Sequence, residues 1–448
     1  MMILLINPKT TKSTEINAEY FREPNLGLLY LAAILEDQGI PVDILDLEQF
    51  YPLNDSDLEG IIENKIQGYS IFGLTTLTNN FNYTLQIIKI IRRLVPQSKI
   101  ILGGPHASFL YNDILNMENL VNYVCVGEAE QSFTELLRIL MNDTGIQEVT
   151  ITQYESLLRK IKGIAFKNHI GKIEFTGTPE PVNINTLPLP ARYKLVHEYY
   201  HYRVASVIIN RGCPNQCSFC SRQNLFKKPR IRNISSILSE IRDIISLQNY
   251  TYINFYDNIN INKQFFKEFC EMFLKNNLNM PWGCELRVDS LTQEEAIALK
   301  KAGCRLVATG IESASPEVLT KNFKYQNPED VMKGLNYLKQ VEMPVQAYFV
   351  LGLPGETEQT FSDTIQYIKQ LSFDANDRIN YFIATPYPGS RLWIEQEQFG
   401  IHIFENDFSK YDCEHVIFQT NELSKDQLEI LHQTAKDVES YFQQGVIK

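Results

Sequence analysis

The chain has 448 residues, of which 44% are hydrophobic and 11% aromatic, and its formal net charge is −11. This length exceeds what one ordinary core supports, so we expect two or three globular domains rather than a disordered chain. The acidic balance argues against general nucleic-acid binding, which needs a basic surface. No apolar run reaches the ~18 residues of a membrane span, and no signal peptide is evident, so we expect a cytoplasmic protein without a membrane span.

In the first region, residues 1–145, short apolar runs alternate with helical patterns, as in "MILLINP", "LGLLYLAAILEDQG" and "PVDILDL". This alternation predicts a doubly wound, Rossmann-like parallel sheet. Small and polar residues follow the expected strands, at the edge where such sheets bind ligands. They are Thr75, Thr76, Gly103, Gly104, His106, Gly127 and Glu128.

Residues 146–195 are less regular, and "GTPEPVNINTLPLPARY" predicts a linker. A second α/β series follows over residues 196–395, with strands expected at "ASVIIN", "TYINFYD", "WGCELRVD", "RLVATGIES", "PVQAYFVLGLPG" and "RINYFIATPYPG". Helical stretches separate these runs, which predicts six strand–helix units of an open or closed barrel. Residues 396–448 are expected to form a C-terminal helical segment, whose last amphipathic helix is capped by Ser424.

The segment "NRGCPNQCSFCSR" places Cys213, Cys217 and Cys220 within eight residues, directly after the first strand of the second series. Cytosolic thiols stay reduced, so this cluster indicates metal binding rather than disulfides. Four thiolates usually hold a four-iron cluster, so three would leave one iron open, as catalytic metal sites require. The alternative is a structural zinc site with a distant fourth cysteine. Such sites usually pair one CxxC with another, and the chain has no second CxxC.

The CxxxCxxC spacing, with Phe219 before the last cysteine, resembles the signature of radical S-adenosylmethionine (SAM) enzymes. "GIESASPEVL", "FVLGLPGETEQTF" and "TPYPGSRLW" resemble segments of the subgroup that carries an N-terminal cobalamin-binding domain, and "NLGLLYLAAILEDQG", "ILGGPHAS" and "VGEAE" resemble that domain. The resemblance covers nearly the whole chain. It implies a Rossmann-like cobalamin-binding domain followed by a partial (β/α)6, TIM-like radical SAM barrel.

The resemblance implies that the three cysteines ligate a [4Fe–4S] cluster whose open iron binds SAM. One electron from the reduced cluster would cleave SAM to methionine and a 5′-deoxyadenosyl radical, so a donor such as flavodoxin or ferredoxin is needed. Candidate SAM-binding residues follow the expected strands, and the alternative for each is a buried, satisfied polar group. They are Asp257, Arg287, Gly310 and Glu312. Asn258 stands where relatives often carry a second acid.

For cobalamin, the resemblance places Thr75, Thr76 and Leu77 at a Ser-x-Leu segment, with Gly103 and Gly104 beside the nucleotide tail. The Asp-x-His-x-x-Gly loop that supplies a histidine to cobalt is missing, and "KTTKSTEINAEYF" stands there instead. We therefore interpret His106 as a cofactor-proximal or structural residue rather than a metal ligand. The alternative is a vestigial domain that no longer binds cobalamin.

Two function classes follow from the resemblance. The first is cobalamin-dependent methylation of an unactivated carbon on a small-molecule or peptide substrate. The second is cyclisation, rearrangement, epimerisation or another hydrogen abstraction, with the N-terminal domain as a scaffold or substrate reader. An iron–sulfur sensor would leave the SAM-site segments unexplained.

Overall fold

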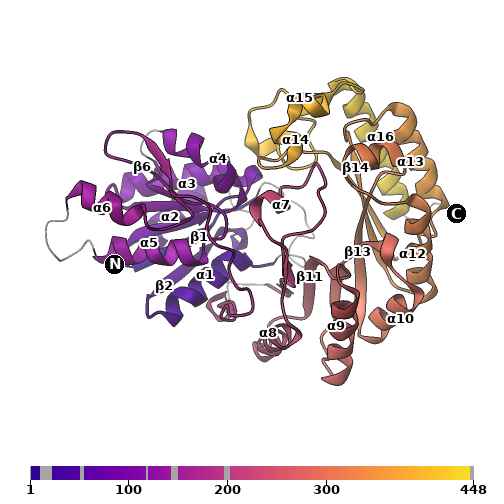
Figure 1. Cartoon of the computed structure of the whole chain (residues 1–448), viewed down its shortest axis with the longest axis horizontal. Coiled ribbons are helices and arrows are strands. Elements are labelled where there is room, and N and C mark those ends of the chain that lie inside the picture. The colour runs from indigo at the N-terminus through magenta and orange to yellow at the C-terminus, as the bar shows by residue number, and fades with distance from the viewer. Residues whose placement is uncertain are drawn as a thin grey trace. The chain divides into compact units, whose positions relative to one another are not determined.

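The computed structural model describes residues 2–10, 23–50, 55–117, 120–142, 150–195 and 202–443. The chain folds as two compact units (Figure 1). Unit 1 comprises Met1–Tyr202, Asn224–Lys228 and Asp407–Ser409. Unit 2 comprises Arg203–Gln223, Pro229–Asn406 and Lys410–Lys448.

Over the described residues, unit 1 contains one seven-stranded sheet in the order β2-β1-β3-β4-β5-β6-β7. The first five strands are parallel, and β6 and β7 are antiparallel to their neighbours. Their bounds are β1 (Met2–Asn7), β2 (Val42–Asp46), β3 (Tyr69–Thr75), β4 (Lys99–Gly103), β5 (Tyr123–Cys125), β6 (Ile164–Lys167) and β7 (Ile173–Phe175). The parallel strands read as near-continuous apolar runs because both faces of the sheet are covered.

Helices cover both faces of this sheet. On one face, α1 (Leu26–Asp37) and α5 (Glu130–Asn142) pack on a core that contains Ile3 and Leu5. On the other face, α2 (Asp55–Lys65), α3 (Phe81–Leu94) and α4 (Pro105–Asn116) pack on Leu4 and Ile6. Successive residues of β1 thus point to opposite faces, and the predicted doubly wound sheet is confirmed.

The stretch that we expected to be a linker is partly structured. It contains α6 (Ile151–Leu158), β6 and β7, and these strands extend the sheet of unit 1. A tight turn joins β6 to β7: the Asn168 N–H donates to Lys172 O at 2.9 Å, and Gly171 has a φ of +82°. The prediction missed this hairpin because its strands are only four and three residues long. Residues 177–191, which include the proline-rich part, contain neither helix nor strand.

Unit 2 is built on six parallel strands in the order β15-β14-β13-β12-β11-β8. The bounds are β8 (Val204–Ser206), β11 (Tyr252–Asn258), β12 (Trp282–Glu285), β13 (Cys304–Glu312), β14 (Val345–Leu351) and β15 (Arg378–Ile383). All six expected strands are present, and β8 and β15 do not pair with each other, so the barrel is partial.

Helices alternate with these strands, and Figure 1 shows several of them side by side along the outside of the sheet. They are α8 (Ile234–Ser246), α9 (Lys263–Lys275), α10 (Gln293–Lys301), α11 (Pro316–Lys321), α12 (Pro328–Gln340) and α13 (Glu358–Gln370). This strand–helix alternation confirms the predicted TIM-like half-barrel.

The C-terminal part contains the expected helix and, in addition, a short pair of strands. After α14 (Arg391–Ile394) and α15 (Gln396–Phe399), an antiparallel pair forms from β16 (Ile401–Ile403) and β17 (Phe418–Thr420). The last helix, α16 (Lys425–Gln443), packs against β15. Ser424 caps it as expected, because its hydroxyl accepts the Gln427 N–H at 3.4 Å. Within the part of the chain that the structure describes, no helix has the length and apolarity of a membrane span.

Candidate functional site

The three clustered cysteines lie in the loop between β9 (Asn210–Arg211) and α7 (Arg222–Leu225). Their thiols are free and partly exposed, and the Cys220 N–H donates to Cys217 O at 3.1 Å, which makes the loop tight. Among the described residues, no three His, Cys, Asp or Glu side chains are arranged to hold a single metal ion. A preformed zinc site is therefore absent from this part of the chain. A four-iron cluster takes its thiolates on separate irons, so it does not require the three thiols to converge on one point.

Asp257, near the end of β11, holds both flanks of the cysteine loop. Its Oδ2 accepts the N–H groups of Ile209 at 2.7 Å and Asn210 at 3.0 Å, just before the cysteines. Its Oδ1 accepts from the guanidinium of Arg222, just after them. The structure therefore places Asp257 beside the predicted cluster site, with contacts to the loop itself.

The middle of the loop is held by a residue that the sequence analysis did not select. Ser218 Oγ donates to Asn322 Oδ1 at 2.7 Å, and the Ser218 N–H donates to Asn322 O at 3.0 Å. Asn322 caps the C-terminus of α11 and is fully buried. No local signal connects positions 104 residues apart, so only the fold reveals this contact.

Glu312, at the end of β13, forms an ion pair with Lys324, whose Nζ lies 2.8 Å from Glu312 Oε1. Both side chains are buried. Glu312 has a φ of +63°, a conformation that costs a non-glycine residue about 1–3 kcal/mol. Gly310 makes room for the pair, since a side chain there would collide with the Glu312 carboxylate and lie 3.3 Å from Lys324 Nζ. The structure thus brings together two predicted residues and one that was missed, Lys324.

Arg287 lies two residues beyond β12 and reaches the same loop. Its Nη2 is 2.7 Å from Asp289 Oδ2, and its Nη1 is 3.4 Å from Oδ1 of Asn215, which lies between the first two cysteines. Nη2 also donates to the carbonyl of Tyr325. Arg287 therefore connects the cysteine loop to the segment that carries Lys324.

The thiols are surrounded by low-dielectric protein. Burial raises the pKa of Cys217 to about 11, with the Lys324 charge opposing and the Glu312 charge reinforcing the shift. Burial also raises the pKa of Cys220, against an N–H donated by Arg222. Ligation by iron therefore has to displace protons from these thiols.

In unit 1, the predicted cobalamin residues of β3 and β4 are in direct contact. The Thr76 N–H and Oγ1 each donate to Gly103 O at 2.8 Å, and Thr76 Oγ1 accepts the Ala107 N–H at 3.0 Å. Gly104 has a φ of +92°, and a side chain there would lie 2.6 Å from Thr76 O. Only glycine fits at position 104. The structure thus brings Thr76, Gly103 and Gly104 together.

Open space adjoins this contact. A side chain at Gly103 would meet no atom within 4 Å, which leaves the strand end free for a group that approaches the backbone. Leu77 is 40% exposed beside it, and Thr75 is half-buried. These features fit a large, partly apolar cofactor such as cobalamin. The loop at residues 9–21, which lacks the Asp-x-His pair, lies mostly outside the described residues.

His106 is 1% exposed and lies between the rings of Phe81 and Phe408, at centroid distances of 4.2 and 4.7 Å. Its Nδ1 is 3.2 Å from Thr78 Oγ1. Burial lowers the pKa of His106 to about 3, so the ring is neutral at physiological pH. This packing supports the structural role rather than metal ligation.

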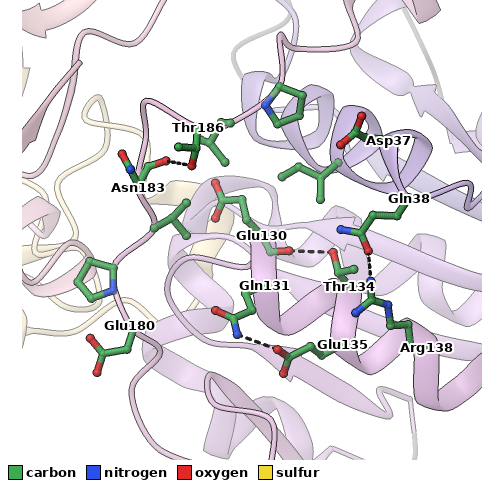
Figure 2. A pocket seen from close by; sticks show the side chains of 15 residues that line it. Asp37, Gln38, Glu130, Gln131, Thr134, Glu135, Arg138, Glu180, Asn183 and Thr186 are labelled. Carbon is green, nitrogen blue, oxygen red and sulfur yellow. Dashed lines mark hydrogen bonds between the residues drawn. The ribbon is translucent and has the colours of Figure 1, made fainter. Parts of the chain in front are cut away.

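A separate pocket of about 440 Å³ lies between α1, α5 and residues 180–188 of unit 1. Figure 2 shows acidic and neutral polar side chains around it, and the Arg138 guanidinium donates to Gln38 at 2.7 Å. None of the predicted site residues lines this pocket. Its labelled side chains are Asp37, Gln38, Glu130, Gln131, Thr134, Glu135, Arg138, Glu180, Asn183 and Thr186.

A three-thiol loop after the first strand of a parallel half-barrel defines an iron–sulfur enzyme, and a doubly wound domain with an open strand end precedes it. The family comparison agrees with both features. The radical SAM superfamily model matches residues 207–368, and the B12 binding domain model matches residues 18–137. The chain belongs to the radical SAM superfamily and carries a B12-binding domain on its N-terminal side. The radical SAM match implies a [4Fe–4S] cluster and SAM as cofactors, and the B12-binding match implies cobalamin.

Among curated proteins, an uncharacterized methyltransferase of Pyrococcus horikoshii is 29% identical over 405 residues, covering 88% of this chain and 82% of that protein. An anaerobic magnesium-protoporphyrin IX monomethyl ester cyclase of Rubrivivax gelatinosus is 26% identical over 440 residues, covering 96% of this chain and 75% of that protein. Similar proteins thus include both a methyltransferase and a cyclase.

Among solved structures, the radical SAM methyltransferase TsrM from Kitasatospora setae, with cobalamin and a [4Fe–4S] cluster bound, matches with a TM-score of 0.74 at 17% identity, over 98% of this chain and 88% of that chain. The cobalamin-dependent radical enzyme OxsB, with aqua-cobalamin and SAM bound, matches with a TM-score of 0.74 at 16% identity, over 98% of this chain and 67% of that chain. These likenesses confirm the two-part fold.

Proposed function

We propose that the protein is a cobalamin-dependent radical SAM methyltransferase that acts on an unactivated carbon of a small molecule or peptide. The observation that carries this proposal is the strand end at Gly103, which is open to a large cofactor. The sequence has no Asp-x-His pair that would offer cobalamin a histidine.

The residues of this chain would bind, orient and shield the cofactors, which supply the difficult chemistry. Cys213, Cys217 and Cys220 would hold the cluster, while Asp257 fixes both flanks of their loop. When bound, the cluster supplies the electron that cleaves SAM, and cobalamin supplies the methyl relay. A low-potential donor such as flavodoxin or ferredoxin would deliver that electron.

For SAM, we assign binding to the strand ends that face the cysteine loop. Glu312, paired with Lys324, and Arg287, bonded to Asn215, present opposite charges beside the thiols. SAM carries an ammonium and a carboxylate, which need an acceptor and a donor of this kind. Gly310 would act indirectly, because it makes room for the Glu312 carboxylate.

The second candidate is a different radical reaction, such as cyclisation, with the N-terminal domain as a scaffold. The similarity of this chain to the cyclase of Rubrivivax gelatinosus supports this second candidate. The test is to incubate the anaerobically reconstituted protein with hydroxocobalamin, desalt it and record the visible spectrum. We expect stoichiometric retention. Lack of retention, with 5′-deoxyadenosine still formed from SAM, would favour the scaffold reading instead.

A further inference from the structure

Three cationic side chains approach the cysteine loop from three different parts of unit 2. Arg222 follows the last cysteine and donates to Asn210 O at 3.1 Å. Arg287, beyond β12, donates to Asn215 within the loop. Lys324, beyond α11, interacts with Cys217 through its charge. We call Arg222, Arg287 and Lys324 the basic collar.

Each collar cation is held by a carboxylate. Arg222 pairs with Asp257, Arg287 with Asp289 and Lys324 with Glu312. These six residues come from distant parts of the chain, so the arrangement depends on the fold.

The pairs are oriented with their cations toward the thiols. At Cys217 the influence of Lys324 exceeds that of its partner Glu312. Arg222 acts on Cys213 and Cys220, and Arg287 acts on Cys213 and Cys217. Asp289 and Glu312 hold their cations in place, while Asp257 also accepts two N–H groups at the flank of the loop.

Lys324 is buried, yet its pKa lies above the ordinary value for a lysine. Burial lowers the pKa of Lys324, but the Glu312 carboxylate and the charge of Cys217 together outweigh burial and hold that pKa above its ordinary value. Glu312 adopts a left-handed backbone conformation to make this pair, and Gly310 leaves the space for it. Strain of this kind is often found at functional sites.

We propose that the basic collar raises the reduction potential of the cluster held by the three cysteines. Reduction adds one electron, and hence one negative charge, to the cluster, and no bond forms or breaks in that step. Nearby positive charges stabilise the reduced state more than the oxidised state, and net charge around a cluster is one of the determinants of its potential. The collar would let a low-potential donor of the flavodoxin or ferredoxin class reduce the cluster.

The test is an EPR-monitored redox titration of the full-length, anaerobically reconstituted protein, without SAM, cobalamin or substrate. We expect Lys324→Met, Arg222→Gln and Arg287→Gln each to make reduction harder. A tenfold fall in the ratio of reduced to oxidised cluster at a fixed poise corresponds to a shift of about 59 mV for one electron.

A matched control is Lys339→Met. Lys339 also forms a largely buried ion pair, 2.7 Å from Asp377, but at the start of β14, the opposite end of the strands from the cysteines. The Lys339→Met variant should leave the reduction potential of the cluster unchanged. The charge-preserving variants Arg222→Lys and Lys324→Arg should also keep the parent potential.

Two results would overturn the proposal. One is that the charge-removing variants have the same reduction potential as the Lys339→Met control. The other is that the charge-preserving variants change the reduction potential as much as the charge-removing ones. If Lys324→Met fails to assemble a cluster, the reduction potential of Arg287→Gln tests the proposal instead, because the Arg287 side chain is 19% exposed and less tightly packed. The inference rests on the cluster of the proposed function, but the titration involves no methyl transfer. A failed cobalamin test would therefore leave it standing.

Discussion

The strand ends of the two units are built in opposite ways. In unit 2, ion pairs such as Glu312–Lys324 surround three thiols. In unit 1, backbone contacts between Thr76 and Gly103 leave a bare strand end. The difference indicates two ways of binding a cofactor. A small, charged cluster would be held by ligands, with fixed charges setting its reduction potential, whereas a large cofactor would bind where no side chains fill the space.

The buried titratable groups of the two units also respond to pH in opposite directions. Burial raises the pKa of Glu356 in unit 2 to about 8, although the Gly352 N–H opposes this shift. Burial lowers the pKa of His106 in unit 1 to about 3. Both side chains are thus mainly neutral at pH 7. Ionisation of Glu356 makes the protein less stable as pH rises, and protonation of His106 makes it less stable as pH falls.

The largest effect is expected from removing the ligands of unit 2. Replacing Cys213, Cys217 and Cys220 by alanine should reduce iron from about four atoms per chain to none and abolish SAM cleavage. Iron analysis and detection of 5′-deoxyadenosine measure both losses. Cys413→Ser, at a free cysteine outside the loop, should retain the cluster. Full zinc occupancy with no iron uptake in the anaerobically purified parent protein would contradict the assignment.

Substitutions at three glycines test whether cobalamin binds at the bare strand end of unit 1. Gly104→Ala places a side chain 2.6 Å from Thr76 O at a positive φ, so it should cost at least ~2 kcal/mol of unfolding free energy and abolish cobalamin retention. Gly171→Ala, also at positive φ but with no atom within 4 Å, should cost only ~1 kcal/mol and retain cobalamin.

Gly103→Ala completes this series, because its side chain would enter the open space itself. It should leave the unfolding free energy within ~0.5 kcal/mol of the parent while weakening cobalamin retention. Visible spectra after desalting and denaturant unfolding give the two readouts. Unchanged retention in Gly103→Ala would place the cofactor elsewhere.

In unit 2, the neutral Glu356 should make stability fall as pH rises. The folded-state pKa of about 8 exceeds the ordinary pKa of 4.5 for a glutamate, so between these values the native state binds more protons than the unfolded state. The resulting loss is on the order of 3 kcal/mol at pH 7, and it grows toward pH 8. Glu356→Gln should flatten this slope in denaturant unfolding at different pH values. Glu317→Gln, at an exposed position, should keep it, and an equal slope in both variants would contradict the assignment.

In unit 1, the neutral His106 should produce the opposite slope at a smaller size. Its folded-state pKa of about 3 lies below the ordinary pKa of 6.5 for a histidine, so the stabilisation is present above pH 6.5 and is lost as pH falls. At pH 5 the loss is about 2 kcal/mol. His106→Gln should reduce the acid sensitivity of cobalamin retention, while His402→Gln, at an exposed position in unit 2, should not. Identical acid profiles for parent and His106→Gln would show that this histidine is not responsible.

Much of the fold was predictable because it rests on local patterns. The apolar runs of β1, β3 and β4 and the six strands of unit 2 are each long or repeated enough to be recognised. The β6–β7 and β16–β17 pairs were missed because their strands have three or four residues and, unlike the equally short β8 and β12, belong to no repeated strand–helix pattern. Such short runs give too little periodicity to separate a hairpin from a loop.

The sequence by itself predicted the ligand set, because Cys213, Cys217 and Cys220 are neighbours along the chain and their spacing indicates the chemistry. Only the tertiary structure decided what surrounds them. Asn322 and Lys324 lie more than 100 positions away in the chain. Charge and hydrogen bonding act through space, so their partners depend on which strand ends the parallel sheet brings together.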